Sequence, residues 1–332
     1  MPIGGVVSGR EEIAAGTKAE TAGDFVAAAA AYQSALEDRD ERIVGDAEFH
    51  LGRVAWRQGH FEAAKERFEA ARAIALRIDD PEARARAENG LGIVHYGRGE
   101  YVQARAALTV ARDLSRDPIM RAKAMLNLGI IANIEGDLES AQGNYLRSRA
   151  AFQQAEDTGG EALALHNLGM LYADLQDWDS ADEAFAQCLA LSERRGDRVL
   201  IASVLVNRSE VSCARERYDG AIADCDLAIS IAEEIGAEVQ RGEALRWKGH
   251  ALWRAGRHEP AEESLREAVR IAHRTHVKLL EGEAARDLGL QAIELGEAPR
   301  ARKWLARAAQ LFEALGAQRE LAAVRDALAQ LS

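Results

Sequence analysis

The chain has 332 residues, of which 48% are apolar and only 5% aromatic, and it contains five prolines. This balance is typical of long helices packed through small side chains and argues against a β-sandwich, which favours β-branched and aromatic residues. The formal net charge of −12 argues against nonspecific nucleic-acid binding. The sequence contains no apolar run of about 18 residues, so no membrane span is predicted.

The amino-terminal sequence MPIGGVVSGREE lacks the basic region and the long apolar core of a secretory signal. We expect residues 1–8 to form a flexible N-terminus, with regular structure starting at residue 9. The absence of a signal favours a cytoplasmic protein.

From residue 9 onward, a pattern of small and large residues recurs with a period close to forty. In the second unit it reads Gly52, a turn at Gly59, Ala64 and Phe68. Eight such units are predicted, starting near residues 9, 45, 85, 122, 162, 202, 242 and 282 and ending at residue 317. The unit around Ser209 is the weakest match.

Each unit is predicted to be two helices joined by a tight turn, because apolar residues recur at three-to-four spacing on both sides of the turn. Asp80-Pro81 and Asp117-Pro118 pair an N-cap acid with a proline at the first helical position. Pro260 and Pro299 are expected to open second helices. Residues 318–332 form a further amphipathic segment, predicted to be a helix that caps the end of the stack.

This recurring pattern of LG, turn glycine, alanine and aromatic residue resembles the tetratricopeptide repeat family over about residues 9–331. The period near forty is similar to the longer repeats of kinesin light chain, of Leu-Gly-Asn-type adaptors and of sensor regions in bacterial regulators. The resemblance implies an all-α solenoid, a right-handed superhelix whose first helices line a concave groove. The unit with the sequence NRSE departs from the pattern, because Arg208 replaces an apolar residue. Its local packing is therefore in question.

The resemblance also implies which positions of the first helices face the groove: 2, 5, 6, 9, 12 and 13, counting the recurring glycine as position 8. The same positions also hold Asp287 and Glu294. The predicted peptide-binding residues are Arg53, Trp56, Arg57, Arg86, Asn89, Tyr96, Lys123, Asn127, Asn133, His166, Asn167, Asp174, Asn207, Glu210, Arg246, Trp247, His250, Trp253, Arg254 and Arg286.

Asparagines are concentrated at these positions, and three of the six in the chain, Asn127, Asn167 and Asn207, are spaced by forty residues. A side-chain amide can bond both the N–H and the C=O of a peptide backbone. Three residues of an extended ligand span roughly 9–10 Å, which is of the order of the spacing between repeats. We therefore expect a row of amides that holds a ligand backbone. The alternative is that these amides bond the neighbouring helix and stiffen the stack.

Aromatic and cationic residues are expected at both ends of this row. Trp56 and Trp253 are predicted to be partly exposed in the groove, whereas Trp178 and Trp304 are predicted to lie in the core. Such basic lining suggests a protein or peptide partner that carries acidic side chains or a free C-terminus. The two predicted patches consist of Arg53, Trp56 and Arg57, and of Arg246, Trp247, His250, Trp253 and Arg254.

No sequence motif points to catalysis, and the chain contains no P-loop, GxGxxG, GxSxG or HExxH. We expect neither enzymatic activity nor a cofactor. His273 and His276 are interpreted as solvated side chains rather than metal ligands, so no metal site is predicted. The three cysteines form no CxxC pair and are predicted to be reduced thiols at helical positions.

The sequence therefore favours a non-enzymatic scaffold or adaptor that holds an extended peptide segment in its groove. One alternative is a regulatory sensor module that controls a separate effector protein. Another is a purely structural oligomerisation scaffold. The oligomeric state stays open.

Overall fold

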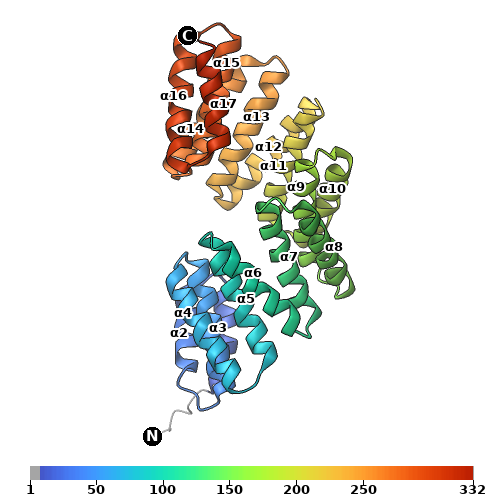
Figure 1. Ribbon diagram of the computed structural model, residues 1–332, viewed down its shortest axis with the longest axis vertical. Coiled ribbons are helices and arrows are strands. Elements are labelled where there is room, and N and C mark those ends of the chain that lie inside the picture. Colours follow the sequence, from blue (N-terminus) through green and yellow to red (C-terminus); the bar gives the residue numbers. More distant parts are fainter. Residues whose placement is uncertain (1–7, 332) are drawn as a thin grey trace. The chain divides into compact units, whose positions relative to one another are not determined.

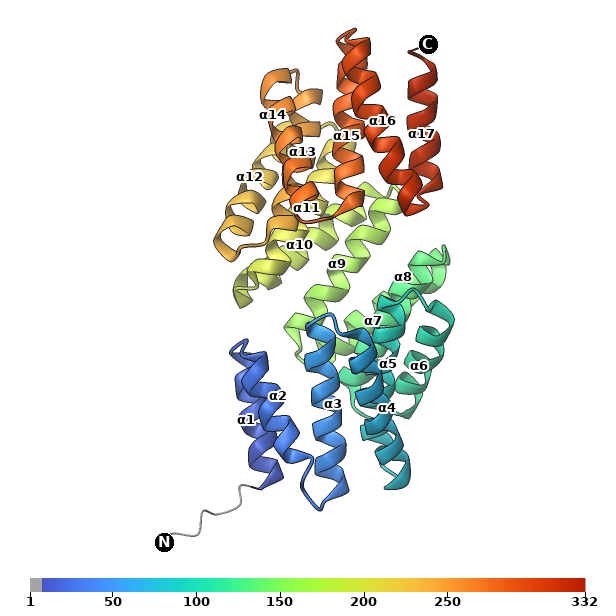
Figure 2. The same ribbon diagram turned by 90° about the vertical axis from the view of Figure 1, so that its left-hand side faces the viewer.

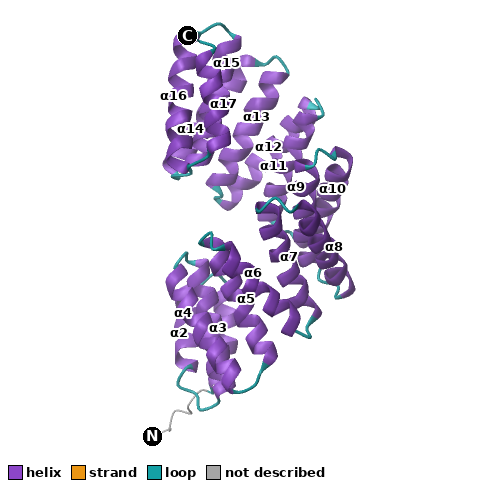
Figure 3. Cartoon of the chain, in the orientation of Figure 1, coloured by secondary structure: helices purple, strands orange, loops and turns teal. Residues whose placement is uncertain are grey.

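The computed structural model describes residues 8–331, and within this range every regular element is an α-helix (Figure 3). The prediction of an all-α fold is confirmed. The predicted flexible segment lies outside the described residues except for Ser8. That residue is the N-cap of the first helix, and with Glu11 it completes a capping box.

The chain divides into two compact units, residues 1–171 and 172–332. Consecutive helices of the first unit pack against one another as hairpins (Figure 1). Its helices are α1 (Gly9–Thr21), α2 (Phe25–Ala35), α3 (Glu41–Arg57), α4 (Phe61–Arg77), α5 (Pro81–Gly97), α6 (Tyr101–Leu114), α7 (Pro118–Ile134) and α8 (Leu138–Gln154).

The helix α9 (Thr158–Asp174) begins in the first unit and ends in the second. The second unit is also built from consecutive hairpins and ends with a single helix, α17. Its helices are α10 (Trp178–Arg195), α11 (Arg198–Ala214), α12 (Tyr218–Ile235), α13 (Glu238–Arg254), α14 (His258–Arg274), α15 (Lys278–Glu294), α16 (Ala298–Leu315) and α17 (Gln318–Ala329).

Side-chain caps mark the start of several helices, whereas α4, α6 and α12 to α17 begin without a side-chain cap hydrogen bond. Asp80 and Asp117 cap α5 and α7, and the prolines that follow them occupy the first helical position, as predicted. Pro299 is the second residue of α16, but Pro260 is the third residue of α14, so it does not open that helix. Its missing N–H still costs nothing there, because the N–H groups of the first turn have no intrahelical partner.

The first helices of the second to eighth hairpins begin four residues before the predicted repeat starts, for example at residue 41 rather than 45. The predicted starts are counted from the recurring glycine, whereas the helices begin at the residue that follows the N-cap. The hairpin turns lie where they are predicted. Each turn has a residue with positive φ, which is usually glycine, as at Gly59 (φ 76°). In two turns the residue is not glycine: Gln176 and Glu216 both adopt φ 59°.

Small residues bring the helices of a hairpin into close contact. A Cβ atom placed on Gly52 would lie 2.8 Å from the ring of Phe68, and one on Gly90 of the next hairpin would lie 2.6 Å from the same ring. Phe68 therefore fills the space that two glycines from successive first helices leave open. In the first unit α3 contacts α5 and α5 contacts α7, so these first helices form a continuous layer (Figure 2).

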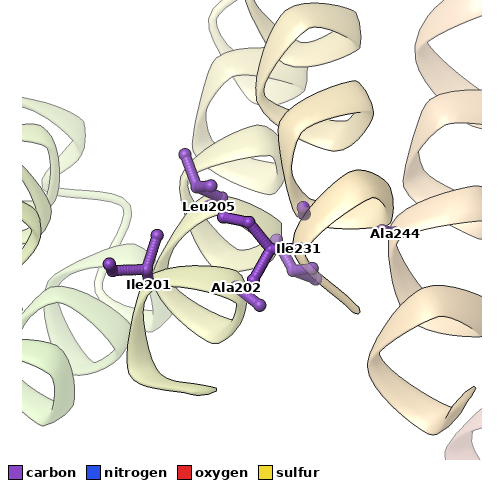
Figure 4. Packing of buried hydrophobic residues seen from close by; sticks show 7 residues of the cluster. Ile201, Ala202, Leu205, Ile231 and Ala244 are labelled. Atoms are coloured by element: carbon purple, nitrogen blue, oxygen red, sulfur yellow. The ribbon is translucent and has the colours of Figure 1, made fainter. Parts of the chain in front are cut away.

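The second unit has the same kind of core. Ile201 and Leu205 of α11, Ile231 of α12 and Ala244 of α13 are buried together (Figure 4). The unit with the unusual NRSE sequence keeps this packing. Arg208 reaches from α11 to α12 and donates from Nε and Nη2 to the two carboxylate oxygens of Asp224, at 2.7 and 2.5 Å. A bidentate ion pair thus takes the place of an apolar contact.

Candidate functional site

A hollow of about 470 Å³ lies on the first-helix layer of the first unit, and we refer to it as the basic hollow. It contains six of the predicted binding residues, drawn from α3, α5 and α7. Phe68 of α4 and Gly90 contribute to its floor. Its lining residues are Phe49, His50, Arg53, Trp56, Arg57, Phe68, Arg86, Asn89, Gly90, Ile93, Met120 and Lys123.

Two of its arginines are held by a buried carboxylate from α1. Glu20 is 4% exposed, and its Oε1 accepts from Arg53 Nη2 at 2.8 Å and lies 3.7 Å from Arg57 Nε. The hydroxyl of Tyr32 donates to the other oxygen of Glu20 at 3.0 Å. Glu20 therefore fixes both arginines at one end of the hollow while it neutralises one of their charges.

The other two cations differ in their pairing. Arg86 Nη2 donates to Asp46 Oδ1 at 2.6 Å, and its guanidinium lies 5.7 Å from the centre of the Phe49 ring. Lys123 is exposed and forms no ion pair with any residue between 8 and 331. Four cations line the hollow and two carboxylates pair with them, so the site keeps a net positive charge of two.

Histidine contributes no charge to the hollow at neutral pH. The ring of His50 stacks on Tyr32, with centroids 4.8 Å apart. Burial, followed by the nearby Arg53 cation, lowers the pKa of His50 to about 4. The positive potential is therefore supplied by arginine and lysine alone.

A second, smaller hollow of about 200 Å³ adjoins the first and shares Trp56 and Ile93 with it. We refer to it as the apolar hollow, because Asn127 is its one lining residue with a polar side chain besides the aromatic Trp56 and Tyr96. Trp56 and Tyr96 are each 40% exposed. The predicted partial exposure of Trp56 is therefore confirmed. The lining residues are Trp56, Gly92, Ile93, Tyr96, Leu108, Asn127 and Ile130.

The amides of the predicted row make different contacts. Asn127 Nδ2 donates to Asn89 Oδ1 at 3.5 Å, so two successive repeats are linked by a long, weak hydrogen bond. Asn167 Nδ2 donates at 2.8 Å to the carbonyl of Leu163 on its own helix. Asn133 and Asn207 are half-buried in α7 and α11. Ligand contact by these amides stays a prediction.

Two other predicted positions lie in or near α9. Burial lowers the pKa of His166 to about 4, and Asp174 is exposed at the end of that helix. Neither residue lines the basic or the apolar hollow.

In the second unit two residues of the predicted aromatic-cationic patch, Trp253 and Arg246, are buried instead of exposed in a groove. Trp253 is only 8% exposed and donates from Nε1 to Glu294 at 2.6 Å, so its predicted exposure is wrong. Its indole packs into the core with Leu252 and Ala261. Half-buried Trp247 and His250 make an edge-to-face contact, and Arg254 is exposed.

Arg246 is also buried rather than free in a groove. It is 9% exposed, its Nε lies 3.2 Å from Asp287 and 3.7 Å from Glu283, and its guanidinium lies over the Trp247 ring. Arg286 binds the same aspartate at 3.0 Å. The predicted basic lining is therefore wrong here, because carboxylates on α15 neutralise these arginines. Glu210 is exposed on α11 and adds a further negative charge to the unit.

Several residues of the basic hollow are absent from the predicted binding residues. Phe49 and His50 occupy positions 5 and 6 of the second repeat, and Ile93 occupies position 9 of the third. The position rule includes all three, so a fuller reading of it would have found them. Glu20 carries no such signal, because its role depends on the packing of α1 against α3.

Two kinds of feature are absent from residues 8–331. No group of three or more His, Cys, Asp and Glu side chains is arranged to hold a metal ion in this range. None of the described helices combines the length and the hydropathy needed to cross a membrane. Cys188, Cys213 and Cys225 are buried and form no disulfide.

Comparisons with known proteins give a curated relative and several solved structures. Regulatory protein AfsR of Streptomyces griseus is 25% identical over 241 residues, which cover 63% of this chain and 24% of AfsR. The chain thus spans about a quarter of that relative. A signal transduction ATPase with numerous domains and a tetratricopeptide repeat sensor, from Pyrococcus horikoshii, has a TM-score of 0.69 at 16% identity, with 90% of this chain and 47% of that chain covered. A Rap protein complexed with Competence and Sporulation Factor has a TM-score of 0.66 at 12% identity, with 97% of each chain covered.

Family models described as tetratricopeptide repeat match residues 13–64, 44–117, 120–194 and 200–273. Together these matches span well over half of the 332 residues. They coincide with the helical hairpins of both units. The chain therefore belongs to the tetratricopeptide repeat family.

Proposed function

We propose that this chain is a non-enzymatic, cytoplasmic module that binds an extended segment of a partner protein through the first-helix layer of its first unit. The partner segment carries carboxylates, either as acidic side chains or as a free C-terminus. One observation carries the proposal: the basic hollow combines four cations with the exposed indole of Trp56, which is the composition of a site for an anionic group beside an apolar one.

The fixed positions of three of the four cations favour ligand binding. Arg53 and Arg57 are held by Glu20, and Arg86 is held by Asp46, so a ligand does not have to order these side chains. Preorganisation of this kind lowers the entropy that association costs. Lys123 has no ion-pair partner among the described residues and supplies the charge that a ligand carboxylate would neutralise.

Selection from a random heptapeptide library displayed on phage tests this proposal. The wild-type chain is expected to enrich sequences rich in Asp and Glu. Arg86→Ala with Lys123→Ala should reduce the binding of these sequences about tenfold or more, since a hydrogen bond to a charged group contributes about 1.5–3 kcal/mol. Lys303→Ala with Arg319→Ala is the matched control, because it removes the same charge from exposed positions of the second unit.

The proposal is wrong if no acidic sequence is enriched, or if both double variants bind the enriched peptides equally well. Circular dichroism of each variant shows that the helices are intact. The library should be displayed both with an open C-terminus and with the random segment followed by a linker. A preference for the open form identifies a C-terminal carboxylate as the ligand group.

A regulatory sensor role is the second candidate, and the similarity to AfsR and to the Pyrococcus horikoshii protein with a tetratricopeptide repeat sensor favours it. In that role, binding in the basic hollow would control a separate effector. Small-angle X-ray scattering with and without an enriched peptide tests this alternative. A ligand-dependent change in the radius of gyration supports it, and identical scattering curves argue against it. A scaffold role predicts instead a stable oligomer without any ligand, which light scattering measures.

A further inference from the structure

The apolar hollow lies directly beside the basic hollow and has a different chemistry. The two share the side chains of Trp56 and Ile93, so a group bound in one is in contact with the wall of the other. The floor of the apolar hollow is tight. A Cβ atom on Gly92 would lie 2.5 Å from Cγ of Leu108, and that leucine is fully buried.

This hollow leaves apolar surface of two aromatic side chains in water. Trp56 and Tyr96 occupy equivalent positions on successive first helices, and each exposes 40% of its surface. Burying such surface under a ligand side chain contributes about 25 cal/mol per Å². No described charged residue lines this hollow, so an anionic group gains nothing there.

The two hollows are joined by an amide pair. Asn89 lines the basic hollow and Asn127 lines the apolar hollow, and the bond between them is 3.5 Å long. A bond of this length is easily exchanged for one to a ligand. A peptide backbone that passes over this pair can donate to Asn89 and accept from Asn127. Its side chains on either side then reach the two hollows.

The spacing along such a ligand follows from its geometry. Side chains on the same face of an extended chain are two residues, about 6.6 Å, apart. Both hollows are lined by α3, α5 and α7, and on α7 the apolar hollow is reached four to seven residues after Lys123, at Asn127 and Ile130, which is about 6–10 Å along the helix. An acidic residue and an apolar residue separated by two or three positions therefore match the two hollows.

We propose that the apolar hollow is a specificity subsite that takes one large aliphatic side chain, such as leucine, from the same peptide whose carboxylate binds in the basic hollow. The ligand is thus an acid and an apolar residue two or three positions apart. This inference rests on the proposed function and adds the second half of the recognition motif.

The shape of the apolar hollow provides the test. Ile130→Ala enlarges it and Ile130→Trp fills it, and neither change alters a cation of the basic hollow. In the heptapeptide selection, wild type should enrich leucine at two or three positions from an acid. Ile130→Ala should shift this preference to phenylalanine or tryptophan. Ile130→Trp should remove it, with about tenfold weaker binding of the leucine peptides but unchanged enrichment of acids.

Val102→Ala is the matched control, because Val102 is 78% exposed on α6 and lines neither hollow. Two failures can be distinguished. If acids are enriched and depend on Arg86 and Lys123, but the apolar preference is absent or indifferent to Ile130, the apolar subsite is wrong and the proposed function stands. If no acidic sequence is enriched by wild type, both are wrong.

Discussion

Arg53 and Glu20 form an ion pair between α3 and α1, with Arg53 Nη2 2.8 Å from the buried carboxylate of Glu20. This pair both positions the arginine and cancels part of the charge of the basic hollow. Glu20 is buried and does not line the hollow, so its charge repels an anionic ligand but its side chain does not occupy the ligand's space.

Glu20→Gln should therefore strengthen anion binding. The amide oxygen still accepts from Arg53, and the net charge of the site rises by one. We expect acidic peptides to bind about threefold to tenfold more tightly at low salt, with a steeper loss of affinity as NaCl is added. Fluorescence anisotropy at several salt concentrations measures this effect. Unchanged or weaker binding would show that the carboxylate acts mainly by holding Arg53 in place.

Alanine substitutions at two glycines of the first unit should change the stability of the fold in opposite directions. A Cβ atom on Gly52 meets the Phe68 ring at 2.8 Å, so Gly52→Ala should destabilise the fold by about 1–3 kcal/mol. Gly143 is the control, because it lies inside α8 and a Cβ there meets only the flexible Arg147 side chain, at 3.6 Å. Gly143→Ala should stabilise the fold by about 0.5–1 kcal/mol. Urea unfolding measures both, and a neutral Gly52→Ala would contradict the packing.

We expect Arg208 and Asp224 to compensate each other's charge, so that losing one of them destabilises the fold more than losing both. Arg208→Leu restores the apolar residue that the repeat pattern expects but leaves the mostly buried Asp224 carboxylate unpaired. We expect a loss of about 1–3 kcal/mol for this single change. Adding Asp224→Ala should recover most of the loss. A double variant as unstable as the single one would mean that Arg208 contributes packing instead.

Histidine burial predicts how stability depends on pH. His50 has a pKa of about 4 in the fold, well below the ordinary value of about 6.5 expected for the unfolded chain. Above pH 6.5 it is neutral in both states, and between 6.5 and 4 only the unfolded chain gains the proton. Stability is therefore lost as the pH falls, by about 1.4 kcal/mol per pH unit from this group.

His50→Gln removes this contribution. The difference in unfolding free energy between pH 7 and pH 5 should be smaller in this variant than in wild type by about 2 kcal/mol. Burial also lowers the pKa of His166, so some pH dependence remains in the variant. Equal differences in the two proteins would show that His50 titrates normally in the fold.

The hairpins follow directly from the sequence, whereas only part of the candidate site does. Periodic small residues, caps such as Asp80 and turn glycines such as Gly59 are local signals, and each acts within its own hairpin. Exposure of Trp56 was predicted correctly and that of Trp253 was not, although both have the same repeat position. Trp253 is covered because Glu294 of the next first helix accepts its N–H, and a repeat register carries no information on such partners.

Charge is harder to predict from a register for the same reason. Arg246 has the repeat position of a groove residue, but Asp287 and Glu283, about forty residues later, turn it into a buried ion pair. In the first unit a net positive charge remains, because Arg57 shares Glu20 with Arg53 and Lys123 has no carboxylate partner among the described residues. The sign of each surface therefore depends on pairing between repeats.

The link between Asn127 and Asn89 leads to a last prediction, on the purpose of the asparagine row. At 3.5 Å this bond contributes little to stability, so Asn127→Ala should lower the melting temperature by no more than about 1–2 °C. The triple variant Asn127→Ala, Asn167→Ala and Asn207→Ala should weaken peptide binding clearly more than it lowers stability. Ser140→Ala in α8, whose side chain is outside both hollows, serves as a control for binding. If the triple variant instead unfolds readily and the surviving folded protein binds normally, the amides stiffen the stack and do not contact a ligand.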